Sequence, residues 1–236
     1  GLDRSGFDPH EFMNKPLLGT HFQAHEINAT TFIHSAIARS GLSTMQMKDV
    51  YLQTYVDEAD LCVSLADYVN SRHGIREFIY VYYSDVDTLM HRYNADNMRI
   101  DYQFEAFSTV FERAFLENLS QAVGKDTLLI LTADHGSKAT PKYPQYDLAN
   151  HPEFFDHLVM QPTCENRLAF FYIKPGHMQA IREYFNDHWP DDFILVEPGP
   201  ALKLGLFGKG PFHPRAAERL GDLIAVAKRD AYLWWA

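Results

Sequence analysis

The chain has 236 residues, of which 46% are hydrophobic and 14% aromatic, so it can bury one sizeable core and does not have the composition of a disordered chain. Its formal net charge is −10, from 31 acidic and 21 basic residues. Nucleic acids and anionic membranes bind basic protein surfaces, so this charge balance argues against both as the main partner.

Cys62 and Cys164 are the two cysteines, too few for a disulfide framework or a four-cysteine zinc motif. Their scarcity favours a reducing compartment. No apolar run is long enough to span a membrane, and the first residues have neither a Met nor the pattern of a signal peptide. We therefore expect the chain to begin partway through a larger protein, so a targeting segment could precede Gly1 and the compartment stays open.

The first third of the chain predicts a connection followed by helices and a strand. Residues 1–16 carry Gly, Asp, Pro and Asn without periodicity and are typical of a surface connection. Apolar residues at helical spacing in 17–22 and β-branched residues in 27–33 predict a short helix and then a strand. Residues 58–72 place apolar side chains on one face of a helix.

The middle of the chain predicts a strand, a helix and a second strand. Residues 78–83 (FIYVYY) and 127–132 (TLLILT) are continuously apolar or aromatic apart from the threonines, as in strands buried on both faces of a parallel sheet. Phenylalanines recur every three or four positions between them and predict a helix over 101–121. This βαβ pattern favours an α/β fold in which the two strands are parallel neighbours.

The last third predicts a loop followed by further strands. Residues 137–163 hold four of the 12 prolines and form a long loop, a kind of segment that is often functional. Strands are predicted over 168–173, 193–196 and 222–227, and a helix over 177–188. Because no repeat or linker divides the chain, we predict a single portion of one α/β domain over residues 1–236.

The strongest chemical signal is the sequence Ala-Asp-His-Gly at 133–136, directly after the predicted strand 127–132. Ligands of open parallel sheets bind outside the carboxyl ends of the strands, which is where Asp134 and His135 fall. A carboxylate and an imidazole side by side suit zinc or a similar ion. A helix-capping Asp beside a surface His is the plain alternative for this motif alone.

A second Asp and His follow the other predicted strand, 78–83. Asp87 and His91 are four positions apart, so on a helix their side chains share one face and can hold one ion. Asp85 is an alternative to Asp87 that fits this spacing less well. Two strands that each end in an Asp and a His indicate a metal site more strongly than either pair alone.

At these residues the chain resembles the type I phosphodiesterase/nucleotide pyrophosphatase family of the alkaline phosphatase superfamily. That family has a strand ending in Pro-Asp-x-x-Gly-His, a helix, a strand ending in Asp-His-Gly, and an isolated late His. Residues 86–91 (VDTLMH) match the first motif with Val86 replacing Pro and Met90 replacing Gly, and the second motif is complete. His213 stands in the place of the late His, and the order of elements agrees from about residue 17 to residue 227.

The resemblance implies a mainly parallel, alkaline-phosphatase-like α/β fold that is incomplete at its N-terminus. It also implies two divalent metal ions, with zinc expected and manganese as the alternative. Asp87, His91 and His213 would bind one ion, and Asp134 and His135 would contribute to the other. An acidic shell around two dications agrees with the net charge of −10.

The family's nucleophile, a Thr or Ser, and a further metal-ligating Asp lie upstream of the matched segments. We therefore expect both to lie upstream of Gly1, and this chain to be inactive alone. Thr30 and Thr31 are rival nucleophiles, but they fall inside the predicted strand 27–33 rather than at its end. His151 and His157 lie in the long loop and are candidates for contact with substrate.

The implied reaction is metal-dependent, in-line hydrolysis of a phosphodiester or pyrophosphate bond in a small-molecule substrate. One alternative is another activity of the superfamily, such as a phosphomonoesterase, phosphonate hydrolase, sulfatase or phosphosugar mutase, because shared metal ligands do not fix the substrate. Another is a non-catalytic binding fragment. The five candidate ligands argue against it, because a binding module does not need them. Besides substrate, the expected partner is the segment upstream of Gly1, and an uncovered sheet edge favours homo-oligomers.

Overall fold

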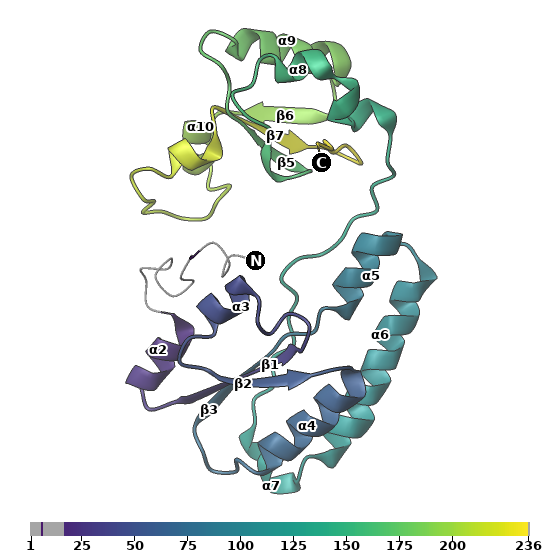
Figure 1. The fold of residues 1–236 in the computed structure, drawn as a ribbon, viewed down its shortest axis with the longest axis vertical. Helices are drawn as coiled ribbons and strands as arrows, with labels where there is room; N and C mark the ends of the chain where they lie inside the picture. The colour runs from purple at the N-terminus through teal and green to yellow at the C-terminus, as the bar shows by residue number, and fades with distance from the viewer. Residues whose placement is uncertain (1–5, 7–16, 236) are drawn as a thin grey trace. The chain divides into compact units, whose positions relative to one another are not determined.

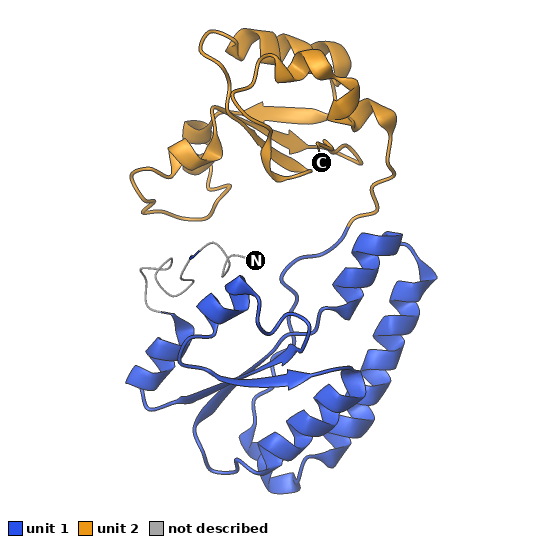
Figure 2. Ribbon diagram, in the orientation of Figure 1, with its two compact units in different colours: residues 1–137 blue, residues 138–236 orange. Residues whose placement is uncertain are grey.

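The computed structural model describes residue 6 and residues 17–235. The chain forms two compact units, residues 1–137 and residues 138–236 (Figure 2). The assignment of both units to one domain stays a prediction. In the part of the chain that the structure describes, no helix is long and apolar enough to cross a membrane.

The start of the chain is the part on which two predictions remain untested. Apart from Gly6, the predicted surface connection lies outside the described residues. Gly1 lies outside them as well, so the structure does not test the expectation that the nucleophile lies upstream of Gly1.

The first unit is built on a three-stranded parallel sheet, which confirms the predicted fold class. Strands β1 (Asn28–His34), β2 (Tyr51–Tyr55) and β3 (Glu77–Val81) lie in the order β2-β1-β3 (Figure 1). Thr31 of the central strand lies opposite Leu52 on one side and Tyr80 on the other. These three side chains therefore share one face of the sheet.

The opposite face of the sheet carries the core of the first unit. Helix α4 (Glu58–Asn70) is capped by Asp57, whose side chain accepts a hydrogen bond of 2.8 Å from the backbone N–H of Asp60. The predicted long helix is also present, as α6 (Met98–Val110) continued by two short helical turns to residue 118. Its apolar face packs on α4 and β1 in one buried cluster made of Phe32, Tyr55, Leu61, Cys62, Leu65, Ala66, Val69, Phe115 and Val123.

The remaining helices of the first unit are short and complete its connections. They are α2 (Leu18–Ala24), α3 (Gly41–Gln46), α5 (Asp85–Tyr93) and α7 (Gln121–Asp126). The strand predicted over 127–132 is not formed. These residues leave α7 as an extended segment, and no backbone hydrogen bond joins them to another strand among the described residues (Figure 1). A strand exists only with a partner, so the prediction of parallel pairing with β3 is wrong for this structure.

The second unit contains a sheet that the sequence analysis did not foresee as separate. Strands β4 (Thr163–Glu165), β5 (Leu168–Phe171), β6 (Phe193–Val196) and β7 (Leu223–Ala227) form an antiparallel sheet in the order β4-β5-β7-β6. The predicted strands and helix are present, the latter as α9 (Met178–His188). Strands β4 and β5 pair antiparallel because a two-residue connection returns the chain from one to the other, which no parallel crossover could do. Strand β7 is also antiparallel to both β5 and β6.

The core of the second unit is aromatic and well covered. Short helices α8 (Pro152–Phe155) and α10 (Pro198–Lys203) and three single turns of 3₁₀ helix join the strands. Trp189 and Phe171 are fully buried among Phe154, Phe185 and their neighbours. Gly221 (φ +74°) leads into β7, and a Cβ there would lie 2.5 Å from the carbonyl oxygen of Phe171. Only glycine fits that turn.

Candidate metal centre

The first predicted ligand pair forms on helix α5, directly after β3. Asp87 and His91 lie one turn apart, with Oδ1 of the carboxylate 3.5 Å from Nε2 of the imidazole. The helical spacing predicted for this pair is therefore correct. The alternative ligand Asp85 lies near Tyr83: burial raises the pKa of Tyr83 to about 12, and the charge of Asp85 adds to the shift.

The anchoring of α5 comes from Tyr83, between β3 and the helix. Its ring stacks on Phe107 of α6 with 4.3 Å between ring centroids, and its hydroxyl accepts a hydrogen bond of 2.7 Å from Gln103. Both partners belong to the long helix that packs on the core. The start of the segment that carries Asp87 and His91 is therefore fixed to the rigid part of the first unit.

The second predicted ligand pair forms in the extended segment after residue 132. Oδ2 of Asp134 lies 3.5 Å from Nε2 of His135, and Oδ1 accepts the backbone N–H of His135 at 3.0 Å. Nδ1 of His135 is 3.0 Å from the carbonyl oxygen of Gly136. Because a carbonyl only accepts, Nδ1 carries the proton in the neutral ring, and Nε2, on the side of Asp134, carries the lone pair.

The donor spacing in both pairs fits a shared metal ion. Two ligands about 2.0–2.1 Å from one tetrahedral ion lie roughly 3.3–3.4 Å apart. The carboxylate oxygen and imidazole nitrogen are 3.5 Å apart in each pair. Carboxylate oxygen with imidazole nitrogen is also a donor set that zinc accepts. Each pair therefore offers two ligands, and a stable site needs at least one more.

The third ligand predicted for the first ion, His213, belongs to the second unit. Its Nδ1 accepts the backbone N–H of Arg215 at 3.1 Å, so in the neutral ring Nε2 carries the proton. His213 is less prepared for a metal than His135, whose ring presents a lone pair at Nε2. Within the described residues, no three His, Cys, Asp or Glu side chains form a group that could hold a metal ion. Convergence of all five residues remains a prediction.

The two pairs are nevertheless related within the first unit. Burial raises the pKa of Tyr80, and the charges of Tyr82 and Asp134 add to that shift. Tyr80 is the second-last residue of β3, the strand that leads to Asp87 and His91. The carboxylate of Asp134 is therefore close enough to Tyr80 to disfavour ionisation of its hydroxyl.

The rival nucleophiles are held inside the sheet. Thr30 is buried, and its hydroxyl lies 2.7 Å from both the hydroxyl of Tyr68 and a carboxylate oxygen of Glu77. Thr31 is fully buried on the other face, with no hydrogen-bond partner for its hydroxyl among the described residues. Neither hydroxyl reaches the surface, where substrate would have to approach. The position of the nucleophile upstream of Gly1 stays a prediction.

The loop histidines are engaged in the second unit. His151 is buried, with Nδ1 2.7 Å from the hydroxyl of Tyr184 and Nε2 3.0 Å from the carbonyl oxygen of Gln145. Both ring nitrogens are used, so His151 supports the core rather than a substrate. His157 pairs with His177 through their Nδ1 atoms, 2.8 Å apart. Sequence reasoning missed both partners because they are distant in the chain.

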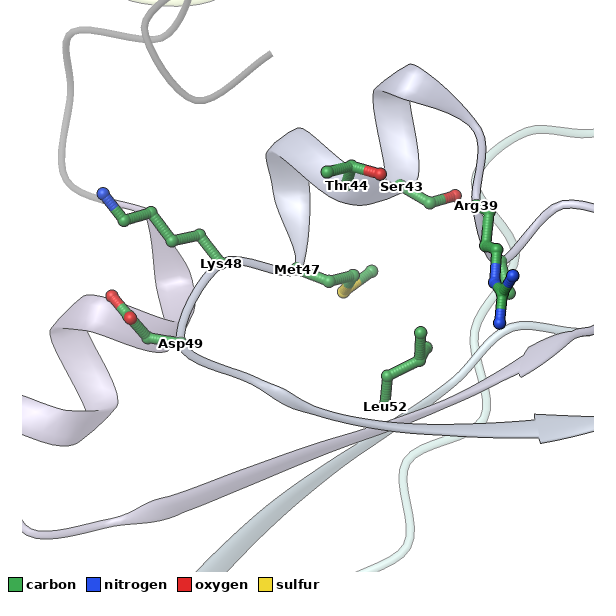
Figure 3. Close-up of a pocket in the computed structure, with 8 residues that line it drawn as sticks. Arg39, Ser43, Thr44, Met47, Lys48, Asp49 and Leu52 are labelled. Atoms are coloured by element: carbon green, nitrogen blue, oxygen red, sulfur yellow. The ribbon is translucent and has the colours of Figure 1, made fainter. Parts of the chain in front are cut away.

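A cavity lies beside α3, and none of the five predicted ligands lines it. Its volume is about 520 Å³. Met47 and Leu52 face each other inside it, with Lys48 and Asp49 at one end and Arg39 at the other (Figure 3). A carboxylate and two separated cations do not make a metal site.

Comparison with known proteins assigns the class of protein. The sequence matches the profile of the family described as type I phosphodiesterase / nucleotide pyrophosphatase over residues 20–234. Because this match spans nearly the whole chain, the protein belongs to that family. No curated protein matches the sequence.

Comparison with solved structures indicates the fold. The chain is similar to murine ectonucleotide pyrophosphatase/phosphodiesterase 5, with 14% sequence identity and a TM-score of 0.56 over 100% of this chain. It is also similar to an inactive form of the same murine protein in complex with AMP, with 15% identity and a TM-score of 0.54 over 99% of this chain. In both comparisons the match covers 60% of the murine chain. The likeness supports the alkaline-phosphatase-like fold, and this chain spans only part of such a protein.

Proposed function

We propose that this chain supplies the metal-ligand part of a hydrolase that cleaves phosphodiester or pyrophosphate bonds. The observation that carries the proposal is the presence of two Asp–His pairs, each with donor atoms 3.5 Å apart. One follows β3, and the other follows the extended segment 127–132. The chain belongs to a family of phosphodiesterases and nucleotide pyrophosphatases, and metal ions bound by these pairs would serve that hydrolysis.

Two divalent ions, zinc or alternatively manganese, fit the donor types of the two pairs. Asp87 and His91 would hold one ion together with His213, and Asp134 and His135 would contribute two ligands to the other. When bound, such ions polarise the phosphoryl group and stabilise the attacking and leaving oxygens of an in-line displacement.

The chain's own residues then act by orientation and charge. The bond from Nδ1 of His135 to the carbonyl of Gly136 holds the ring with Nε2 beside the carboxylate of Asp134. The stacking of Tyr83 on Phe107 fixes the start of the segment that carries Asp87 and His91. Such pre-positioning reduces the reorganisation needed when metal and substrate bind.

The substrate proposed is a small phosphoester, and a nucleotide is favoured because the similar murine structure is in complex with AMP. We expect the nucleophile and at least one further metal ligand to lie upstream of Gly1. Two facts support this. Thr30 and Thr31 are buried, and the match covers 60% of the murine chain.

Metal content and hydrolysis of a chromogenic phosphodiester test the proposal. The 236-residue chain alone should hold about one divalent ion and show no turnover, because Asp134 and His135 are only two ligands. The complete product of the gene should hold two ions and lose activity on treatment with a chelator. His91→Ala there should lower kcat by more than the roughly 10–100-fold that loss of a second-shell partner costs.

The matched control is His73→Ala, since His73 is an exposed histidine of the same unit outside both pairs. It should leave metal content and kcat unchanged. Two tightly held ions and full activity in the 236-residue chain would refute the proposal that part of the site lies upstream of Gly1. Thr30 and Thr31 would then be the first candidates for the nucleophile. Unchanged kcat in His91→Ala would refute its role as a ligand.

A further inference from the structure

A buried histidine in the second unit joins two helices through a chain of hydrogen bonds. His151 directly precedes α8, and Tyr184 lies on α9, which is beside α8 in Figure 1. Nδ1 of His151 is 2.7 Å from the hydroxyl of Tyr184, and that hydroxyl is 3.1 Å from Oε1 of Glu153 on α8. Nε2 of His151 is 3.0 Å from the carbonyl oxygen of Gln145. The chain of contacts therefore fastens residues 145–153 to α9.

The three contacts of this chain need three protons. The carbonyl of Gln145 can only accept, so Nε2 of His151 donates to it. One proton must also lie between His151 and Tyr184, and another between Tyr184 and Glu153. A neutral imidazole and a tyrosine hydroxyl bring only two protons when the carboxyl group of Glu153 is ionised. The third proton must therefore sit on Glu153 or on the second ring nitrogen of His151.

The surroundings assign this third proton to His151. The backbone N–H of Glu153 itself and the hydroxyl of Tyr184 lower the pKa of the Glu153 carboxyl, which is exposed and stays ionised at neutral pH. Burial raises the pKa of Tyr184, and the hydrogen bond with Glu153 adds to the shift, so the hydroxyl keeps its proton. His151 then donates from both ring nitrogens, to Tyr184 and to Gln145, as an imidazolium does.

Other groups around the ring favour or oppose its charge. Trp189 packs against it with 4.8 Å between ring centroids, and an aromatic face attracts a cation. His188 of α9 has its ring centroid 5.4 Å away, is exposed, and would repel a charged His151 once it is protonated itself. Burial of His151 also disfavours the charge. The two hydrogen bonds that the ring donates and the nearby carboxylate of Glu153 offset this cost.

We propose that His151, Tyr184 and Glu153 form a pH-sensitive clamp that is closed while His151 carries two ring protons. Loss of one ring proton leaves two protons for three contacts, so one hydrogen bond must break. In the unfolded chain His151 has none of these partners, so the folded state holds the proton more tightly. The clamp therefore stabilises the second unit on the acidic side of the histidine range, and the effect is lost as pH rises through that range. The proposed hydrolase activity plays no part in this inference.

Urea unfolding of the 236-residue chain at about pH 6 and about pH 8.5 tests the clamp, because histidines titrate between these values. Tryptophan fluorescence follows the second unit, since Trp189, Trp234 and Trp235 all lie there. The equilibrium constant for unfolding should rise roughly tenfold from the lower to the higher pH, as expected when a hydrogen bond to a charged group is lost.

Two substitutions separate the clamp from other titrating groups. Glu153→Gln keeps an acceptor beside Tyr184 and removes the charge that favours the imidazolium, while Tyr184→Phe keeps the ring and removes the hydroxyl. Both should lose most of the pH dependence, whatever they do to the midpoint at one pH. Glu183→Gln is the matched control, because Glu183 is exposed on α9 and accepts a hydrogen bond from Gln179 of the same helix. It should keep the full dependence, and equal dependence in all four proteins would overturn the proposal.

NMR of histidine ring nitrogens gives an independent test. In the folded chain labelled with ¹⁵N at histidine, at about pH 6, both ring nitrogens of His151 should carry protons, and His151→Gln identifies their signals. A single protonated nitrogen would overturn the proposal. The contact between His157 and His177 has the opposite sign, because two imidazolium rings cannot share a hydrogen bond between Nδ1 atoms 2.8 Å apart. Stability that falls only as pH is lowered would therefore belong to that pair and would also overturn the clamp.

Discussion

Two apolar runs of similar make-up end in opposite states in this protein. Residues Leu168–Phe171 form β5, which is hydrogen-bonded to β4 on one side and β7 on the other, and its last three residues are buried. Residues 128–131 are just as apolar but extended, unpaired among the described residues and exposed. The supply of partner strands, more than intrinsic preference, decides which apolar run becomes a strand.

The same contrast extends to the two units. The second unit pairs its strands within residues 138–236 and buries an aromatic core between its sheet and α9. The first unit buries one face of its three strands under α4 and the long helix, while Leu52, Phe78 and Tyr80 stay partly exposed on the other face. We infer that the second unit has the more complete fold within these residues.

The largest expected effect separates the two apolar runs. Phe171→Ala should destabilise the second unit by about 3–5 kcal/mol, because the side chain is fully buried against Phe154 and Phe185. Ile130→Ala should cost less than about 0.5 kcal/mol. All three tryptophans lie in the second unit, at 189, 234 and 235, so urea unfolding followed by tryptophan fluorescence reports on that unit alone.

A control for this comparison comes from circular dichroism, which follows both units together. Phe171→Ala should move only the part of the transition that fluorescence also detects. Similar losses for Phe171→Ala and Ile130→Ala would mean that the extended run is already part of a packed core. The contrast between the two runs would then fail.

Local patterns explain why most elements were predictable from the sequence. The helical spacing of phenylalanines gave α6, and the apolar runs gave β3, β5 and β7 within two residues of their observed bounds. The predicted burial of residues 78–83 on both faces is wrong for β3, since Phe78 and Tyr80 are exposed on one face. Pairing was predicted less well, because it depends on residues far apart in the chain. The antiparallel sheet of the second unit and the missing strand at 127–132 are both failures of that kind.

In the candidate site as well, contacts set by local spacing were predictable and the others were not. The contact between Asp87 and His91 follows from a four-residue spacing on a helix, and the sequence is enough to predict it. The hydrogen bond that sets the tautomer of His135 depends on the turn at Gly136, which no spacing rule describes. The contact of His151 with Tyr184 could not be predicted from the sequence either, because the two residues are 33 positions apart.

A smaller effect concerns the core of the first unit. Cys62 is fully buried, and burial, with a contribution from Glu58, raises the pKa of its thiol from 9.0 to about 11. The folded state then binds a proton that the unfolded state releases between these two values, so stability is present below pH 9 and falls as pH rises toward 11. The loss should be on the order of 1–2 kcal/mol in the first unit.

Circular dichroism of urea unfolding between about pH 8 and 11 would measure this loss, read from the part of the transition that tryptophan fluorescence does not follow. Cys62→Ala should reduce the pH dependence of the first unit between about pH 9 and 10. Above pH 10 the buried tyrosines Tyr55 and Tyr83, whose pKa values burial also raises, should keep part of it. Cys164→Ala, which removes the exposed cysteine of the second unit, is the matched control and should leave that dependence unchanged. Equal pH dependence in both variants would mean that Cys62 is not the titrating group.

The smallest expected change in stability is that of His91→Ala in the absence of metal. The same substitution is the most informative one when metal is present. The side chain of His91 is 80% exposed and its contact with Asp87 is an exposed i,i+4 pair, so His91→Ala should change the stability of the metal-free chain by less than about 0.5 kcal/mol. Added zinc should stabilise the first unit of the unaltered chain, since an ion that binds only the folded state shifts unfolding by mass action. The variant should lose this stabilisation.

If His213 joins Asp87 and His91, zinc must also raise the tryptophan-detected transition of the second unit, because one ion would then be held by both units. A zinc effect confined to the first unit would leave His213 out of the site, and a zinc effect that survives His91→Ala would remove His91 as a ligand.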